Sequence, residues 1–211
     1  MVVDSGKFDW EAAGVSRCPM LNAPDPSYHG AVWTEAVKPL GPIAYILKMR
    51  VTLLRDVGAC LSPFNAFLFL QGIETVCLRM RAHSDNSLAV AKYLESRPEV
   101  KQVIHPSTIP EQHLTKKYLS RGSSGLCGFE LVGGKEAGMT FISSLKMLYH
   151  VANLGDARSL AIHPASTTHS QLSDEEQVST GVTPGYIRLS IGIEHIDDII
   201  ADIKQALDAT I

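Results

Sequence analysis

The order of apolar patterns after Val100 constrains the fold of this 211-residue chain more than any other feature. Short runs with the two-residue alternation of strands are separated there by runs with helical spacing. The last run places its apolar residues from Ile196 to Leu207 on one helical face. This order predicts a small α/β domain whose helices cover one face of a largely antiparallel sheet. Strands are expected at residues 103–105, 126–132, 150–152, 159–162 and 186–191, and a further helix at residues 137–148.

The first 98 residues predict a different organisation. Prolines and glycines are frequent up to Pro42, so this stretch is expected to be largely irregular but packed. Apolar spacing then predicts a helix that starts at Ile43 and ends near Gly58, and a second helix starts at Ser62 and Pro63. A long helix over residues 76–98 is expected to link a domain of residues 1–75 to the small domain of residues 99–211.

Composition and charge exclude several function classes. The net charge of −3 and the pI near 6.2 predict no binding to nucleic acid or to an anionic membrane. No apolar run reaches the roughly 18 residues that span a bilayer, and the N-terminus lacks the order of a secretory signal. A cytoplasmic protein is therefore expected. The four cysteines are widely spaced, which predicts reduced, mostly buried thiols.

No metal site is predicted. The chain has eight histidines, but none belongs to an H-E-x-x-H motif or to a close pair backed by cysteines. His163 and His169 are separated by a proline-led loop and not by a helical turn. The acidic run from Ser173 to Glu176 has the spacing of a capping box, which predicts the start of a helix.

Arg188 is the strongest candidate for a binding residue. In Ile187-Arg-Leu-Ser-Ile191 it alternates with apolar residues, so its guanidinium is expected to point away from the core. Such an arginine can bind a carboxylate with two parallel hydrogen bonds. The alternative is an arginine on a solvated strand face.

Four blocks together resemble the pyridoxal-phosphate enzymes of cysteine and methionine metabolism, which include cystathionine lyases and synthases and methionine gamma-lyase. Within that family the blocks most resemble the O-acetylhomoserine sulfhydrylase group. The resemblance implies the C-terminal part of a fold-type I transferase: the end of the cofactor-binding large domain, the linking helix and the small domain. The blocks are CLSPFNAFLFLQGIETVCLRM from Cys60, NLGDARS from Asn153, HPASTTH from His163 and GYIRLSIGIE from Gly185.

The resemblance also implies a role for three residues. Arg188 would bind the α-carboxylate of an amino-acid substrate. Asn153 would assist through its side chain and neighbouring backbone, and Thr168 would line the same pocket. Alternatively, Asn153 caps the turn that follows it, and the Thr168 hydroxyl bonds to its own loop.

No catalytic or cofactor-binding residue is expected on this chain. In the family, a lysine in a Ser-x-Thr-Lys context forms a Schiff base with pyridoxal 5'-phosphate, and the resemblance places it upstream of residues 3–6. Lys146 lies in a similar Ser-Ser-Leu-Lys run, but we interpret it as a solvated helix residue. The cofactor is thus expected in the complete enzyme and not on this chain alone. A complementary N-terminal half and a homo-oligomer are the expected partners.

The implied reaction is a γ-replacement in which sulfide displaces acetate from O-acetylhomoserine and gives homocysteine, a step of methionine biosynthesis. A truncated chain without the lysine is expected to be inactive alone. Two alternatives remain open at this point. The chain could be a non-catalytic remnant that serves as an interaction module, or a fragment of a related enzyme such as methionine gamma-lyase or O-succinylhomoserine sulfhydrylase.

Overall fold

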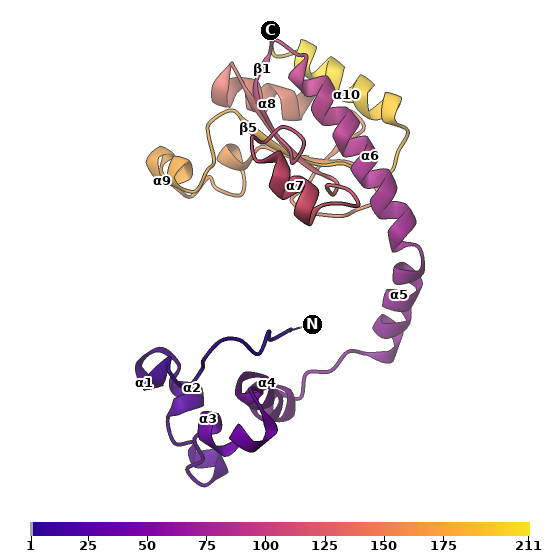
Figure 1. Ribbon diagram of the computed structural model, residues 1–211. Coiled ribbons are helices and arrows are strands. Elements are labelled where there is room, and N and C mark those ends of the chain that lie inside the picture. Colours follow the sequence, from indigo (N-terminus) through magenta and orange to yellow (C-terminus); the bar gives the residue numbers. More distant parts are fainter. Residues whose placement is uncertain (1) are drawn as a thin grey trace. The chain divides into compact units, whose positions relative to one another are not determined.

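The computed structural model describes residues 2–211, which form two compact units with a boundary between Phe69 and Leu70 (Figure 1). Each unit has its own buried core. The boundary falls a few residues before the long helix that the sequence predicts as a linker, so the whole of that helix belongs to the C-terminal unit. The assignment of residues 1–75 to a cofactor-binding domain stays a prediction.

The N-terminal unit is built from short helices, whereas its many prolines and glycines up to Pro42 predicted a largely irregular but packed stretch. Its small core contains Trp33, whose indole N–H donates to the buried Asp25 carboxylate at 2.8 Å. The Lys48 ammonium and the Trp33 indole hold the pKa of Asp25 below its usual value. The elements are α1 (Gly14–Arg17), α2 (Pro19–Asn22), η1 (Pro26–Tyr28), α3 (Trp33–Ala36), η2 (Lys38–Leu40), α4 (Ala44–Met49) and the π-helical η3 (Arg50–Val57).

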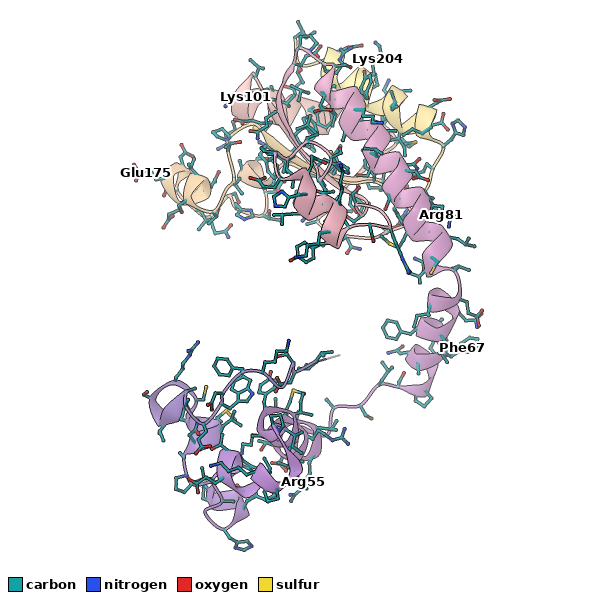
Figure 2. All side chains as sticks on the ribbon, viewed as in Figure 1. Arg55, Phe67, Arg81, Lys101, Glu175 and Lys204 are labelled. Carbon is teal, nitrogen blue, oxygen red and sulfur yellow. The ribbon has the colours of Figure 1, made fainter. Side chains whose placement is uncertain are left out.

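The predicted helix after Ile43 is confirmed, as α4 continued by η3, and it ends at Gly58 with a φ of 69°. Two further helices follow, α5 (Pro63–Glu74) and α6 (Val76–Glu95). Ser62 begins α5 as predicted, because its hydroxyl accepts the Asn65 backbone N–H at 3.1 Å. No residue of α5 is buried, and Phe67 projects outward from it (Figure 2).

The C-terminal unit contains a five-stranded sheet in the order β1-β2-β5-β4-β3. All neighbouring strands are antiparallel except β3 and β4, so the prediction of a mostly antiparallel sheet is confirmed. The strands are β1 (Val100–Ile104), β2 (Leu126–Leu131), β3 (Tyr149–His150), β4 (Leu160–Ile162) and β5 (Tyr186–Ser190). The remaining helices are α7 (Gln112–Tyr118), α8 (Gly134–Ser144), η4 (Pro164–Ser166), α9 (Asp174–Ser179) and α10 (Ile196–Asp208).

The core of this unit lies between the sheet and three helices. Alternate residues of β2 and β5 point into it, among them Phe129 and Leu189, which are both fully buried. Helices α6 and α10 lie side by side (Figure 1), and both pack with α8 against this face. The predicted apolar face of α10 is confirmed, because Ile199, Ile203 and Leu207 are buried. The other face of β5 is therefore free to carry polar side chains.

The C-terminal end of helix α8 differs from the end that the sequence predicts. The apolar spacing predicts a helix up to Leu148, but the helix ends at Ser144. The reason is the buried carboxylate of Asp202 on α10, which accepts the backbone N–H groups of Lys146, Met147 and Leu148, each at 2.9 Å. These three N–H groups thus donate to a side-chain carboxylate and not to the carbonyl oxygens of a further helical turn. Lys146 lies beyond the helix, and its side chain is exposed.

His163 is part of the packing and not of a metal site. It is fully buried, with Nδ1 at 2.8 Å from the Ser166 hydroxyl and Nε2 at 2.7 Å from the Pro184 carbonyl oxygen. A Cβ on Gly138 of α8 would lie 2.6 Å from Nε2, so only glycine allows this close approach. Burial lowers the pKa of His163, and it also lowers the pKa of the buried His105.

These pKa shifts predict an acid-sensitive fold. Because the unfolded chain takes up protons at these histidines near pH 6.5 and the native state does so only at lower pH, the free energy of unfolding should decrease as the pH falls below about 6.5. Urea unfolding at pH 7.5 and pH 5.5 measures this change. His163→Gln should reduce the difference between the two pH values, and equal stability at both would contradict the prediction.

No helix among residues 2–211 is long and apolar enough to cross a membrane. The four cysteines are free thiols, but the expectation that they are mostly buried is wrong. Only Cys127 is buried, which raises the pKa of its thiol to about 12, whereas Cys60 and Cys77 are exposed. Cys60 precedes α5 and Cys77 lies in the first turn of α6, and neither belongs to a buried core.

Candidate functional site

Strand β5 carries the candidate site on the face opposite the helices. Arg188 lies between Gly128 of β2 and Ile162 of β4 in the sheet register. Tyr186 lies two residues away on the same face, and a Cβ on Gly128 would lie 2.5 Å from its hydroxyl. The tyrosine ring therefore covers Gly128, because that position has no side chain of its own. Burial raises the pKa of Tyr186, which keeps its hydroxyl protonated beside the arginine.

The Arg188 guanidinium has capacity for a further partner. The side chain is half-buried, and Nη2 donates a long hydrogen bond of 3.3 Å to the Asn153 carbonyl oxygen. Its Nε is buried and has no hydrogen-bond partner, and no carboxylate within residues 2–211 forms an ion pair with Arg188. Buried N–H groups of native proteins are nearly always satisfied. An anion with two oxygen atoms would satisfy this one.

Asn153 lies next to Arg188, as its predicted role requires, but it contacts the arginine through its backbone. Its side chain is exposed. The loop that carries it is fixed to the sheet, because the Gly155 N–H donates to the Ser190 hydroxyl at 3.3 Å and the Ile193 N–H to the Ala157 carbonyl at 2.9 Å. The amide of Asn153 is thus held at the rim of the site with its hydrogen-bonding groups available.

A carboxylate that sequence reasoning missed closes this loop. Glu194 accepts the Ser159 backbone N–H at 2.6 Å and the Ser159 hydroxyl at 2.9 Å. The same hydroxyl accepts the Gly192 N–H at 2.8 Å. Glu194 lies in the Gly-Ile-Glu run after β5. An acidic residue so close to the end of a buried strand was the sequence feature that could have predicted this role. The network ties the C-terminal end of the Asn153 loop to the residues that directly follow the strand of Arg188.

Glu194→Gln should therefore loosen the loop. The amide keeps one acceptor oxygen but loses the charge and presents a donor to the Ser159 N–H, so we expect a loss of roughly 1–2 kcal/mol in the free energy of unfolding. Hydrogen exchange should become faster at Gly155 and Ser159. Asp197→Asn, an exposed acidic residue nearby, is the control. Equal effects of both substitutions would argue against the network.

Thr168 is not joined to the other two predicted residues by any hydrogen bond within residues 2–211. Its exposed hydroxyl lies 2.9 Å from Nδ1 of His169, which agrees with the alternative that it bonds to its own loop. The loop follows η4, which is anchored by the buried His163. A role for Thr168 in substrate binding stays a prediction.

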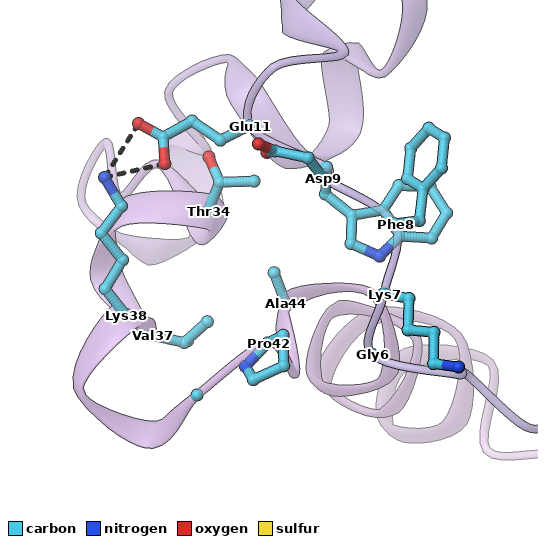
Figure 3. Close-up of a pocket in the computed structure, with 12 residues that line it drawn as sticks. Gly6, Lys7, Phe8, Asp9, Glu11, Thr34, Val37, Lys38, Pro42 and Ala44 are labelled. Atoms are coloured by element: carbon cyan, nitrogen blue, oxygen red, sulfur yellow. Dashed lines mark hydrogen bonds and ion pairs between the residues drawn. The ribbon is translucent and has the colours of Figure 1, made fainter.

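The N-terminal unit contains a hollow of about 430 Å³ that is lined mainly by residues 6–11 and 34–44 (Figure 3). None of the three predicted site residues lines it. Its Lys38 ammonium is paired with Glu11 at 2.8 Å, and Asp9 accepts the Ala12 N–H at 2.9 Å. These three charged groups are thus paired or hydrogen-bonded within the chain.

No three His, Cys, Asp or Glu side chains gather as a metal site would need in the described part of the chain, residues 2–211. The site on β5 thus consists of a guanidinium, a backbone carbonyl and an exposed amide side chain at its rim. Such a group can bind and orient an anion, but it contains no base or nucleophile.

Comparisons with known proteins agree with this geometry. The family model described as "Cys/Met metabolism PLP-dependent enzyme" matches residues 28–208. The chain is 48% identical to an O-acetyl-L-homoserine sulfhydrylase of Leptospira meyeri, over 98% of this chain and 48% of the relative. It is 49% identical to a homocysteine synthase of Schizosaccharomyces pombe, over 99% and 48% of the two chains. The chain spans about half the length of the curated relatives it matches.

A solved structure from Campylobacter jejuni is similar in fold. Its description names an O-acetylhomoserine (thiol)-lyase with a pyridoxyl-lysine phosphate at position 205 of that chain. The TM-score is 0.77 at 44% sequence identity, and the match covers 92% of this chain and 45% of the other. The fold-type prediction made from the sequence is therefore confirmed.

Proposed function

Because this chain belongs to the Cys/Met metabolism family of pyridoxal-phosphate-dependent enzymes, we propose that it supplies the substrate-carboxylate site of an O-acetylhomoserine sulfhydrylase. Two features support this proposal. The relatives named for O-acetylhomoserine or homocysteine match nearly the whole chain. The candidate site also has the chemistry that an amino-acid substrate requires.

The observation that carries the proposal is the incomplete hydrogen bonding of Arg188. A buried Nε without a partner and an Nη2 with only a long bond can both turn to one carboxylate. The strand holds the base of the side chain, so the guanidinium is positioned before the substrate arrives. Asn153 completes the site at the rim through its exposed amide, and Thr168 is proposed to line the same pocket.

In the proposed reaction, sulfide forms a carbon–sulfur bond at Cγ of O-acetylhomoserine and acetate leaves, which gives homocysteine. When bound, the cofactor supplies the electron sink that makes the protons at Cα and Cβ acidic. The residues of this chain orient the substrate: Arg188 fixes the α-carboxylate and thereby the direction of the Cα–H bond. Correct orientation of this kind lowers a barrier by several kcal/mol.

We propose that the cofactor is held by the half of the protein that this chain does not match. Lys146, the lysine whose sequence context comes nearest to the family pattern, is exposed beyond the end of α8. Its backbone is bound to Asp202, on the helical side of the sheet, whereas Arg188 lies on the other side. A homo-oligomer of the complete enzyme is also proposed, from the family resemblance.

Cofactor binding tests this division. The isolated chain should form no specific adduct with pyridoxal phosphate, because the family resemblance places the Schiff-base lysine and the phosphate-binding residues in the half that this chain does not match. Reduction with borohydride followed by peptide mapping measures this. Scattered, weak labelling of exposed lysines is expected, and one stoichiometric adduct at Lys146 or any other single lysine would contradict the proposal.

A further inference from the structure

Tyr186 lies in the candidate site, but the proposed function gives it no role. Its side chain is on the same face of β5 as Arg188, opposite the core residues Ile187 and Leu189. The ring extends toward β2, because a Cβ on Gly128 would lie 2.5 Å from the hydroxyl oxygen and 2.7 Å from Cε2. The φ of Gly128 is not positive, so the ring and not the backbone conformation requires glycine at this position.

The Arg188 guanidinium extends to the other side of β5. Its Nη2 donates to the carbonyl oxygen of Asn153, which follows β3. In the order of the sheet, β2 lies on one side of β5, and β4 and β3 lie on the other. Gly128 is the direct neighbour of Arg188 on β2, yet the space above it is filled by the tyrosine ring and not by the arginine. The two long side chains of β5 therefore occupy opposite sides of the strand.

The side that the ring occupies leads to a competing partner for Arg188. Glu130 of β2 lies directly opposite Tyr186, so it is a diagonal neighbour of Arg188 on the same face of the sheet. Such neighbours are about 7–8 Å apart, within reach of a long side chain. The Glu130 carboxylate pairs with Lys101 at 3.0 Å, but the lysine is 61% exposed, and such a pair is weak. A guanidinium could bind the same carboxylate through two hydrogen bonds.

We propose that Tyr186 is a positioning residue, whose ring keeps the Arg188 guanidinium away from Glu130 and available to the substrate carboxylate. The inference rests on the proposed function, which assigns that carboxylate to Arg188. The ring acts by its volume, so phenylalanine should replace tyrosine and a short side chain should not. When the guanidinium divides between the two sides, only the fraction beside Asn153 can bind substrate, and the apparent affinity decreases by that fraction.

Nuclear Overhauser spectra of the isotope-labelled full chain test where the guanidinium lies. The Arg188 Nε–H signal is identified by its absence in Arg188→Lys. In Tyr186→Val we expect cross-peaks from this N–H to the side-chain protons of Glu130, and neither the unsubstituted chain nor Tyr186→Phe should show them. Valine favours a strand but is too short to cover Gly128. Tyr118→Val is the matched control, since Tyr118 is 68% exposed on α7, and it should show no such cross-peaks.

Two further variants keep the test decisive. Tyr186→Leu retains more apolar volume, which protects the fold, and should give the same cross-peaks at lower intensity. Gly128→Leu combined with Tyr186→Val refills the space from β2 and should remove the cross-peaks again. Cross-peaks to Glu130 in the unsubstituted chain or in Tyr186→Phe, or their absence from both Tyr186→Val and Tyr186→Leu, would each overturn the inference.

Kinetics of the enzyme assembled with the complementary half separate this inference from the proposed function. Tyr186→Val should lower kcat/KM for O-acetylhomoserine roughly 3- to 10-fold. If the cross-peaks appear as expected but neither Tyr186→Val nor Arg188→Lys changes kcat/KM, the proposed function fails and the orienting effect of the ring stands. If only Arg188→Lys lowers kcat/KM, the ring has no effect on the site and the inference is overturned. A lower kcat/KM in Tyr186→Val without the cross-peaks would also overturn it, because tyrosine would then act on the substrate itself.

Discussion

Arg188→Lys should lower kcat/KM for O-acetylhomoserine about 10- to 150-fold in an enzyme assembled from this chain and its complementary half. Lysine keeps the positive charge but loses the planar pair of N–H groups, so one charge-assisted hydrogen bond to the carboxylate disappears. Such a bond contributes roughly 1.5–3 kcal/mol to transition-state stabilisation. Steady-state kinetics at saturating sulfide measure the change, and the cofactor absorbance should remain the same.

The control for this substitution is Arg158→Lys, in the loop that carries Asn153. Arg158 is exposed and pairs with Asp156 at 3.5 Å, so its replacement should leave kcat/KM nearly unchanged. Neither substitution should alter thermal stability by much, because Arg188 has no acidic partner within the described residues 2–211. Unchanged kinetics for Arg188→Lys would remove this residue from the site. A large loss of stability with normal kinetics would instead indicate that Arg188 has a structural role.

Asp202→Ala should reduce the free energy of unfolding of the C-terminal unit by at least about 3 kcal/mol, the largest stability change that we predict. The substitution removes the acceptor of three backbone N–H groups, one of them buried and two partly buried, and leaves them without a partner beside the core. Asp202→Asn keeps the shape and one acceptor oxygen, so its loss should be smaller. Urea unfolding monitored by far-ultraviolet circular dichroism measures both.

Asp198→Ala on the same helix separates this effect from a change in helix propensity. Asp198 is exposed in the first turn of α10, where it only interacts with the helix dipole, and its loss should be below about 1 kcal/mol. A loss for Asp202→Ala as small as that for Asp198→Ala would show that the three N–H groups find other partners, and our account of the end of α8 would then be wrong.

The elements with strong periodicity were predictable from sequence. The stripe of α10, the alternation in β5 and the capping box of Ser173 and Glu176 each depend on residues close in sequence, and the structure contains all three. The order of the strands was not predicted, because β5 pairs with β2, which lies far earlier in the chain, and such a pairing leaves no local signal in the sequence.

Features that depend on partners distant in sequence were not predictable. Asp202 lies three residues after the buried Ile199, at the edge of the stripe, where an acidic residue normally faces water. Its partners are more than 50 residues away, so periodicity gave no reason to end α8 early. Glu194 was missed for the same reason. Arg188 was singled out by the alternation of its strand and Asn153 by the family resemblance, but only the structure shows that Asn153 contacts the arginine through its carbonyl.

Homocysteine formation by complementation tests the central claim most directly. This chain, the complementary half of a relative and pyridoxal phosphate are combined with O-acetylhomoserine and sulfide, and homocysteine and acetate are quantified. We predict that neither half alone forms product, that the mixture does, and that Arg188→Lys in this chain lowers the rate about 10- to 150-fold. Product from this chain alone, or a mixture that binds the cofactor but forms no homocysteine, would contradict the account.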